Sequence, residues 1–177
     1  MKKKAILLRG APASGKSTLS HQLVKCFEEK AALIDLDTFR WHFHLTNRSI
    51  HDITPEEHAF AYQNLLTLLE NYAKNGSYHL VVEGLFSWNE SSQHGNVGQI
   101  VELFKAYSFE ANLFLLSAPK KTLWERNVKR EYTVPQEEFD TLYEEVMSST
   151  NPEKEVVINQ EGIEIQAALA IIKTHIF

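Results

Sequence analysis

A short stretch near the N-terminus constrains the fold of this chain more than any other feature. Ala5 to Leu8 form an apolar run that is typical of a buried strand, and residues 10–17 follow with the sequence GAPASGKS. These eight residues fit the pattern G-x-x-x-x-G-K-[ST]. The pattern from Lys16 to about Glu28 then predicts a helix. A strand, a glycine-rich loop and a helix in this order predict a phosphate-binding loop; the alternative is a glycine-rich turn that binds nothing.

The residue types of this loop suit phosphate chemistry. Gly10 and Gly15 permit backbone angles that allow consecutive N–H groups to surround an anion. Lys16 supplies a mobile charge for the β and γ phosphates, and Ser17 offers a hydroxyl to Mg²⁺. The positive end of the following helix points at the same phosphates. The predicted nucleotide-binding residues are Gly10, Ala11, Pro12, Ala13, Ser14, Gly15, Lys16, Ser17 and Thr18.

Size and composition predict one globular domain spanning residues 1–177. The chain has 177 residues, of which 44% are hydrophobic and 23% are charged. No apolar run is long enough to span a bilayer, so we expect no membrane association. The apolar run after Met1–Lys4 is too short for a signal peptide because Arg9 ends it, and we expect a cytoplasmic protein. The single cysteine, Cys26, excludes an internal disulfide and is expected in the core.

Strand and helix patterns alternate along the remaining chain. The expected strands lie at 32–36, 78–84, 109–116 and 156–158, and the expected helices at 54–75, 97–106, 120–130, 135–148 and 162–175. Residues 38–53 are expected to lie over the ligand cleft as a short helix and loop. This alternation predicts an α/β fold with a five-stranded parallel sheet that helices cover on both faces.

Acidic residues follow two of the predicted strands, where the carboxyl ends of parallel strands face the ligand crevice. Asp37 could accept a proton from an attacking hydroxyl there, and Arg40 could reach the same cleft and hold a phosphate. Alternatively, Asp37 caps a short helix and Arg40 is a surface charge; Asp35 has no clear role. Glu83 ends the strand LVVE and could hold Mg²⁺ through water or border the acceptor, or be a structural acid.

A basic helix is predicted from Lys120 to Arg130. Arg126 and Arg130 are four residues apart, so a continuous helix would place them on one face. Two arginines just before a loop suit a lid that neutralises phosphate charge during transfer. The alternative is a solvated helix in which Glu125 pairs with Lys129 on the other face.

Together these motifs resemble the polynucleotide kinase branch of the P-loop kinases. The resemblance rests on GAPASGKST at 10–18, DTFR at 37–40, RNVKR at 126–130 and VPQEEFDTLYEEV at 134–146. That branch includes the 5′-hydroxyl kinase domain of phage polynucleotide kinase. Zeta-toxin-like sugar-nucleotide kinases and chloramphenicol phosphotransferase share the scaffold. The resemblance implies a three-layer P-loop kinase fold with a short helical lid at about 120–135.

The resemblance also implies roles for individual residues. Asp37 would be the general base, and Arg40 would contact a phosphate of the acceptor. Arg126 and Arg130 would be lid arginines on the donor phosphates of ATP, while Lys16 and Ser17 keep their loop roles with Mg²⁺. The adenine would lie between the lid arginine and residues 159–162. The chain departs from the phage enzyme at Glu83, where aspartate is expected.

Aromatic residues and histidines gather in the segment before the second long helix. Trp41, Phe43 and Trp88 could stack on a ring of the acceptor or pack around the cleft. His42, His44, His51 and His58 do not have the spacing of a compact metal site and are expected to line the acceptor pocket or the surface.

The sequence therefore predicts an ATP-dependent kinase that transfers the γ-phosphoryl group to a hydroxyl of a small molecule or nucleotide. A 5′-hydroxyl polynucleotide kinase is the alternative; the net charge of −5 does not favour a nucleic-acid partner. A nucleotide-binding switch is a further alternative, but the chain has neither Asn-Lys-x-Asp nor Asp-x-x-Gly. A binding module that has lost catalysis is the third, and the intact Lys16, Ser17 and Asp37 count against it.

Overall fold

A five-stranded parallel sheet forms the centre of the molecule. The computed structural model describes residues 2–43, 52–131 and 133–177. The sheet has the order β2-β3-β1-β4-β5, and every described pairing is parallel, as the sequence predicts. The strands are β1 (Lys4–Gly10), β2 (Ala31–Asp35), β3 (His79–Gly84), β4 (Glu110–Ser117) and β5 (Val156–Asn159).

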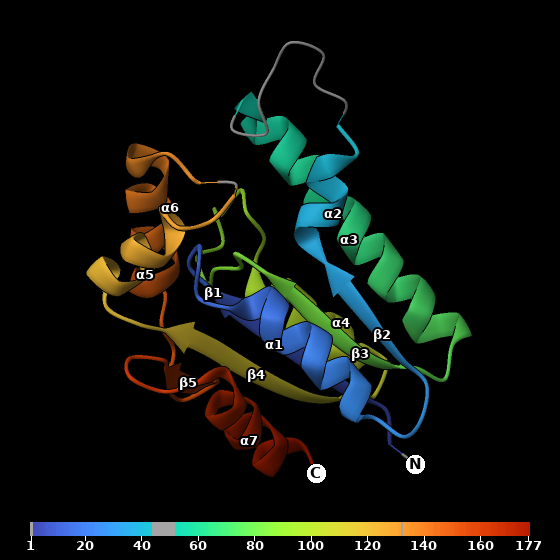
Figure 1. Ribbon diagram of the computed structural model, residues 1–177. Coiled ribbons are helices and arrows are strands. Elements are labelled where there is room, and N and C mark those ends of the chain that lie inside the picture. The colour runs from blue at the N-terminus through green and yellow to red at the C-terminus, as the bar shows by residue number, and fades with distance from the viewer. Residues whose placement is uncertain (1, 44–51, 132) are drawn as a thin grey trace.

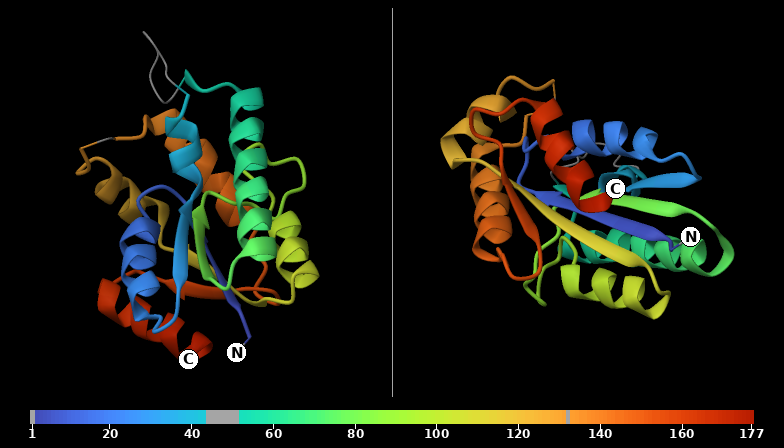
Figure 2. Two further views of the ribbon diagram at one scale, coloured as in Figure 1. Left: turned by 90° about the vertical axis from the view of Figure 1, so that its right-hand side faces the viewer. Right: turned by 90° about the horizontal axis from the view of Figure 1, so that it is seen from below.

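Helices cover both faces of this sheet, which gives three layers (Figures 1 and 2). The described helices are α1 (Lys16–Leu23), a 3₁₀ turn η1 (Val24–Cys26), α2 (Leu36–Trp41), α3 (Pro55–Asn75), α4 (Val97–Ala106), α5 (Lys120–Asn127), α6 (Gln136–Ser148) and α7 (Ile165–Ile176). Figure 2 shows α3 and α4 on one face and α1 and α7 on the other. The expected α/β architecture is therefore confirmed.

Successive side chains of β1 point to opposite faces of the sheet, so this one strand contributes to the core on both faces. Ala5 and Leu7 pack with α3 and α4, whereas Ile6 and Leu8 pack with α1 and α7. Because both faces of β1 are buried, its sequence is a continuous apolar run rather than an alternating one.

The order of the strands places a crevice at the end of β1. The chain leaves β1 for β2 on one side of the sheet, while β4 and β5 lie on the other side. Ligands of open α/β sheets bind outside the carboxyl ends of the strands at such a switch point. In Figure 1, α5 and α6 lie on one side of this end of the sheet and α2 lies on the other.

Several boundaries differ from those predicted. The helix α1 ends at Leu23, where the chain tightens into η1 and then becomes extended at Phe27, with φ −80° and ψ 132°.

Cys26 is only half-buried and its thiol donates to the carbonyl of Gln22, so the prediction of a core cysteine is wrong. The start of α3 is as predicted: Thr54 caps it, and Glu57 completes a capping box. Within the described ranges, no helix is long and apolar enough to cross a bilayer.

Candidate active site

The loop at residues 10–17 turns sharply between β1 and α1. Gly15 has a φ of 83°, in the left-handed region that favours glycine. A Cβ at Gly10 would lie 2.5 Å from the Oγ atom of Ser14 and 2.7 Å from the backbone carbonyl oxygen of Leu116. Both positions therefore require glycine, which explains their place in the motif.

Lys16 lies against the backbone of this loop. Its Nζ atom donates to the carbonyl oxygens of Gly10 at 2.9 Å and Ala11 at 3.1 Å. Burial lowers the pKa of Lys16, and the carboxylates of Glu83 and Asp37 partly oppose that change. The ammonium group thus lies within electrostatic reach of both acids that the sequence singles out.

Glu83 lies beneath the first turn of α1. Its carboxylate is fully enclosed, with 1% of the residue exposed, and accepts from the hydroxyls of Ser17 at 3.0 Å and Ser20 at 2.7 Å. A serine hydroxyl beside a carboxylate is the set of hard oxygen donors that Mg²⁺ prefers, so Ser17 and Glu83 fit a magnesium site. The predicted contact between Glu83 and the acceptor has no support, because Leu85 and not Glu83 lines the cavity.

The two acids after β2 have different roles. Asp35 is the N-cap of α2, and its Oδ1 atom accepts from the backbone N–H of Asp37 at 2.9 Å. Burial and the neighbouring Asp37 raise the pKa of Asp35 to about 6. The cap alternative for Asp37 is therefore wrong: Asp35 caps the helix, and the Asp37 side chain is 51% exposed at the cavity.

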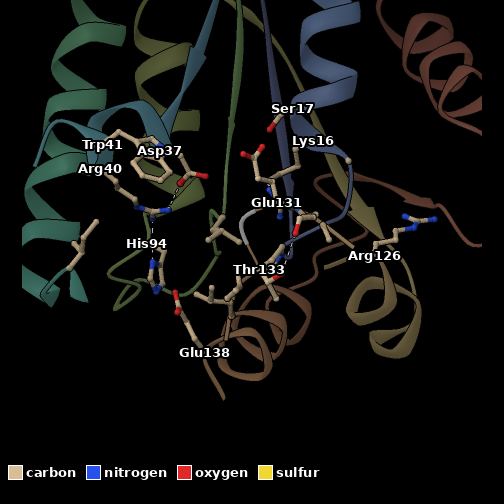
Figure 3. Close-up of a pocket in the computed structure, with 18 of the residues that line it drawn as sticks. Lys16, Ser17, Asp37, Arg40, Trp41, His94, Arg126, Glu131, Thr133 and Glu138 are labelled. Carbon is tan, nitrogen blue, oxygen red and sulfur yellow. Dashed lines mark hydrogen bonds and ion pairs between the residues drawn. The ribbon is translucent and has the colours of Figure 1, made fainter. Parts of the chain in front are cut away.

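Arg40 is held inside the molecule rather than at its surface. Only 5% of the residue is exposed. One terminal nitrogen, Nη1, lies 2.6 Å from Oδ1 of Asp37, and the other, Nη2, lies 3.3 Å from Nδ1 of His94 (Figure 3). The alternative that Arg40 is a surface charge is excluded.

His94 and His58 pack against each other beside this arginine. Their rings meet edge to face with centroids 4.6 Å apart. Burial and the nearby charge of Arg40 lower the pKa of His58 to about 4 and that of His94 to about 3. Both rings are therefore neutral at physiological pH, and Arg40 is the charged member of this cluster.

The predicted lid helix ends earlier than expected, at Asn127 instead of Arg130. Asn127 is completely buried; its amide donates to the carbonyl of Val134 at 2.8 Å and accepts from the N–H of Val134 at 3.2 Å. These bonds close the loop after α5. Arg130 therefore belongs to this loop, so the prediction that Arg126 and Arg130 share a helix face is wrong.

Arg126 connects α5 to the loop after β5. Its Nη2 atom donates to the carbonyl of Gln160 at 3.1 Å. Arg126 therefore lies beside residues 159–162, where the family resemblance places the adenine. Arg126 and Arg130 both line the cavity.

A cavity of about 770 Å³ joins these groups. Figure 3 shows Lys16 and Ser17 in the middle, Arg126 at one end, and Asp37, Arg40, Trp41 and His94 at the other. Of the predicted loop residues, the cavity is lined by Pro12, Ala13, Gly15, Lys16, Ser17 and Thr18, while Ala11 and Ser14 are buried behind them. The remaining wall consists of Asp37, Arg40, Trp41, Ile53, His58, Leu85, His94, Arg126, Arg130, Glu131, Thr133, Val134, Glu138 and Leu142.

Comparison with known proteins agrees with this geometry. Residues 6–147 match the family model AAA_33, described as an AAA domain. The chain belongs to the AAA_33 family. A search of curated protein sequences found no match.

Solved structures of low sequence identity share the fold of this AAA_33 chain. A candidate kinase from Chloroflexus aurantiacus aligns with a TM-score of 0.72 and 18% identity over 98% of this chain and 96% of that one. Shikimate kinase from Aquifex aeolicus aligns with a TM-score of 0.60 and 17% identity over 97% of this chain and 94% of that one. A chain of the Pnkp1/Rnl/Hen1 RNA repair complex aligns with a TM-score of 0.60 and 16% identity over 84% of this chain and 45% of that one. The AAA_33 chain thus has the P-loop kinase fold, and the predicted resemblance is confirmed.

Some predicted residues lie away from the cavity of this AAA_33 protein. Trp88 lines a separate surface hollow with residues 148–151, and Lys154 lies over its ring, so the prediction that it stacks on the acceptor is unsupported. Phe43 packs against Phe60, and His42 packs against Phe39. His44 and His51 fall outside the described residues.

Sequence reasoning missed His94 and Asn127. His94 belongs to a polar loop that carries no motif, and only the fold brings it to Arg40. Asn127 follows Arg126 directly, and a buried asparagine at a helix end is a recognisable loop-closing residue.

Proposed function

We propose that this protein is an ATP-dependent phosphotransferase that moves the γ-phosphoryl group to a hydroxyl of a small molecule or nucleotide. The observation that carries the proposal is the continuous cavity between the phosphate loop and the Asp37–Arg40 pair. A donor phosphate on the loop and an acceptor hydroxyl at Asp37 would share this space. Fixing both reactants in one enclosed site accelerates transfer by removing the cost of their encounter.

Asp37 is the proposed general base. Arg40 engages Oδ1, which leaves Oδ2 to accept the proton of the hydroxyl. The acceptor oxygen forms a bond to the γ-phosphorus as the bond from that phosphorus to the β–γ bridging oxygen breaks. ADP leaves, and the hydroxyl proton remains on Asp37 until it passes to solvent.

Lys16, Arg126 and Arg130 are the proposed stabilisers of the transferring group. Cations around a loose transition state spread the charge of the phosphoryl oxygens. Ser17 and Glu83 would hold Mg²⁺, which neutralises phosphate charge when bound. Residues of about 120–135 form the proposed lid, which excludes water and so limits ATP hydrolysis without acceptor.

The charges of the cavity favour a small acceptor over a polynucleotide. Arg40, which lines the cavity beside Asp37, is already paired with that acid at 2.6 Å. Glu138 adds negative charge to the same wall. Proteins that track a nucleic-acid backbone present a row of unneutralised cations. A 5′-hydroxyl polynucleotide kinase remains the second candidate because the RNA repair complex shares this fold.

A transfer assay with radiolabelled ATP tests the proposal. The acceptor panel contains nucleosides, sugar nucleotides, aminoglycoside and phenolic antibiotics, and 5′-hydroxyl oligonucleotides. We expect a labelled small-molecule product with the wild-type protein and none with Lys16→Met. The control Glu102→Gln alters a carboxylate that is 72% exposed on α4 and should behave as wild type. Labelling of oligonucleotides alone would favour the second candidate, and labelling of nothing would contradict both.

A further inference from the structure

Four side chains from three parts of the fold form a continuous row at one end of the cavity. Glu145 of α6 lies 3.7 Å from Nε2 of His94, and Nδ1 of His94 lies 3.3 Å from Nη2 of Arg40. Arg40 in turn lies 2.6 Å from Asp37 (Figure 3 shows the last two contacts). We propose that His94 is a positioning residue that fixes Asp37 through Arg40. This inference rests on the proposed function because it takes Asp37 as the base.

The row fixes the protonation of the histidine ring. An arginine guanidinium has only donors, so Nδ1 of His94 must be the acceptor in its contact with Arg40. The proton of the neutral ring is then on Nε2, the atom that faces the Glu145 carboxylate. This tautomer gives Arg40 an acceptor and turns the Nε2 proton toward the carboxylate 3.7 Å away, whereas a protonated ring would turn a second donor toward Arg40.

The loop that carries His94 is built to hold it in place. The backbone N–H of His94 donates to the hydroxyl of Ser92 at 3.1 Å, and that hydroxyl donates to Glu145. Gly95 has a φ of 113°, and a Cβ there would lie 2.8 Å from the Tyr62 ring. The Tyr62 hydroxyl donates to the carbonyl of Asn96 at 2.6 Å. The backbone on both sides of His94 is thus held in place.

The guanidinium of Arg40 depends on this anchor. Its Nε atom is buried and has no hydrogen-bond partner among the described residues, so Asp37 and His94 are the partners that orient it there. Without His94, Nη2 would be a buried donor of a charged group that has no other acceptor in the described part of the chain, which costs enough to favour rotation of the group. Rotation would move the Nη1 atom that holds Asp37.

The first test is NMR of the histidine ring and the guanidinium. Long-range ¹H–¹⁵N spectra of the wild-type protein should show His94 protonated at Nε2 from pH 5 to pH 8; the ring signals are assigned by their loss in His94→Leu. Restricted rotation of the Arg40 guanidinium should become about tenfold faster in His94→Leu, because one charged hydrogen bond is lost. His94→Asn places an amide oxygen near the position of Nδ1 and should restore slow rotation. A proton on Nδ1, or equal rotation in all three proteins, would overturn the proposal.

Kinetics separate positioning from a merely structural role. With the acceptor selected by the labelled-ATP panel, His94→Leu should lower kcat about tenfold and leave the KM for MgATP unchanged, and His94→Asn should recover most of kcat. Binding of MgATP, measured by titration calorimetry, checks that both variants fold. Equal losses in His94→Leu and His94→Asn would contradict the proposal. The NMR result does not need an acceptor, so a failed panel with a positive NMR result would reject the proposed function and leave the row intact.

Discussion

Replacing Glu155 by glutamine tests a buried ion pair that joins the elements around the site. Arg9, at the end of β1, is 1% exposed and bonds to both carboxylate oxygens of Glu155, through Nε at 2.7 Å and Nη2 at 2.8 Å. Its Nη1 atom also donates to the carbonyls of Phe86 at 3.0 Å and Val146 at 3.2 Å. The guanidinium therefore ties the loop that carries His94 to the end of α6.

The expected cost follows from leaving that charge without its partner. Removing one member of a buried pair costs about 3–5 kcal/mol. A typical domain unfolds with about 5–15 kcal/mol, so Glu155→Gln should lose a large share of its stability in urea denaturation. The double variant Arg9→Met/Glu155→Met should regain part of the loss because no unpaired charge remains, although the carbonyls of Phe86 and Val146 lose their donor.

A surface pair provides the control for this experiment. Glu102 pairs with Lys105 on α4, with both side chains mostly exposed, so Glu102→Gln should change the free energy of unfolding by less than about 1 kcal/mol. If Glu155→Gln cost no more than this control, the buried pair would not stabilise the fold and the reasoning would be refuted.

Two further variants test the cap of α2 and the phosphate loop. Because the folded protein keeps the Asp35 proton up to about pH 6 and the unfolded chain keeps it only to about 3.8, this residue makes stability fall as pH rises between those values. Asp35→Asn keeps a capping side chain and should flatten the slope by no more than about 1.4 kcal/mol per pH unit in denaturation curves; an unchanged slope would show that Asp35 does not titrate there. Gly10→Ala places a methyl group 2.7 Å from the Leu116 carbonyl oxygen and should weaken MgATP binding at least about tenfold by calorimetry, whereas wild-type affinity would show that the loop yields.

The fold could be predicted from the sequence because its signals are local. Buried parallel strands are short apolar runs, and Thr54, Pro55 and Glu57 mark the start of α3 in the sequence itself. The phosphate loop can be predicted because Gly10 has no room for a Cβ and Gly15 has a positive φ. Any sequence that forms this turn therefore needs glycine at both positions.

The acceptor end could not be predicted to the same degree because its contacts join distant segments. His94 and Arg40 are 54 positions apart, and Arg9 and Glu155 are 146 apart. Local periodicity carries no information on such pairs. The stacking alternative for Trp88 lacks support for the same reason: an aromatic residue in a polar loop has no local signal for which side of the loop it faces.

The end of the lid helix was predicted wrongly for a different reason. A helical pattern through Arg130 was a reasonable prediction from charge and spacing, but Asn127 bonds to both backbone groups of Val134 and turns the chain there. A side chain that competes for backbone hydrogen bonds ends a helix that propensity alone would continue. Arg126 and Arg130 still reach the same cavity, from a helix and from a loop.

Phosphoryl transfer by Asp37→Asn, measured with radiolabelled ATP and the acceptor that the wild-type protein labels, tests the central claim most directly. The amide keeps the shape of the side chain but cannot take a proton, so transfer should fall about 10²–10⁴-fold while MgATP binding is retained. Wild-type protein without acceptor should hydrolyse ATP slowly. Near-normal transfer by Asp37→Asn, or rapid hydrolysis without acceptor, would contradict the account.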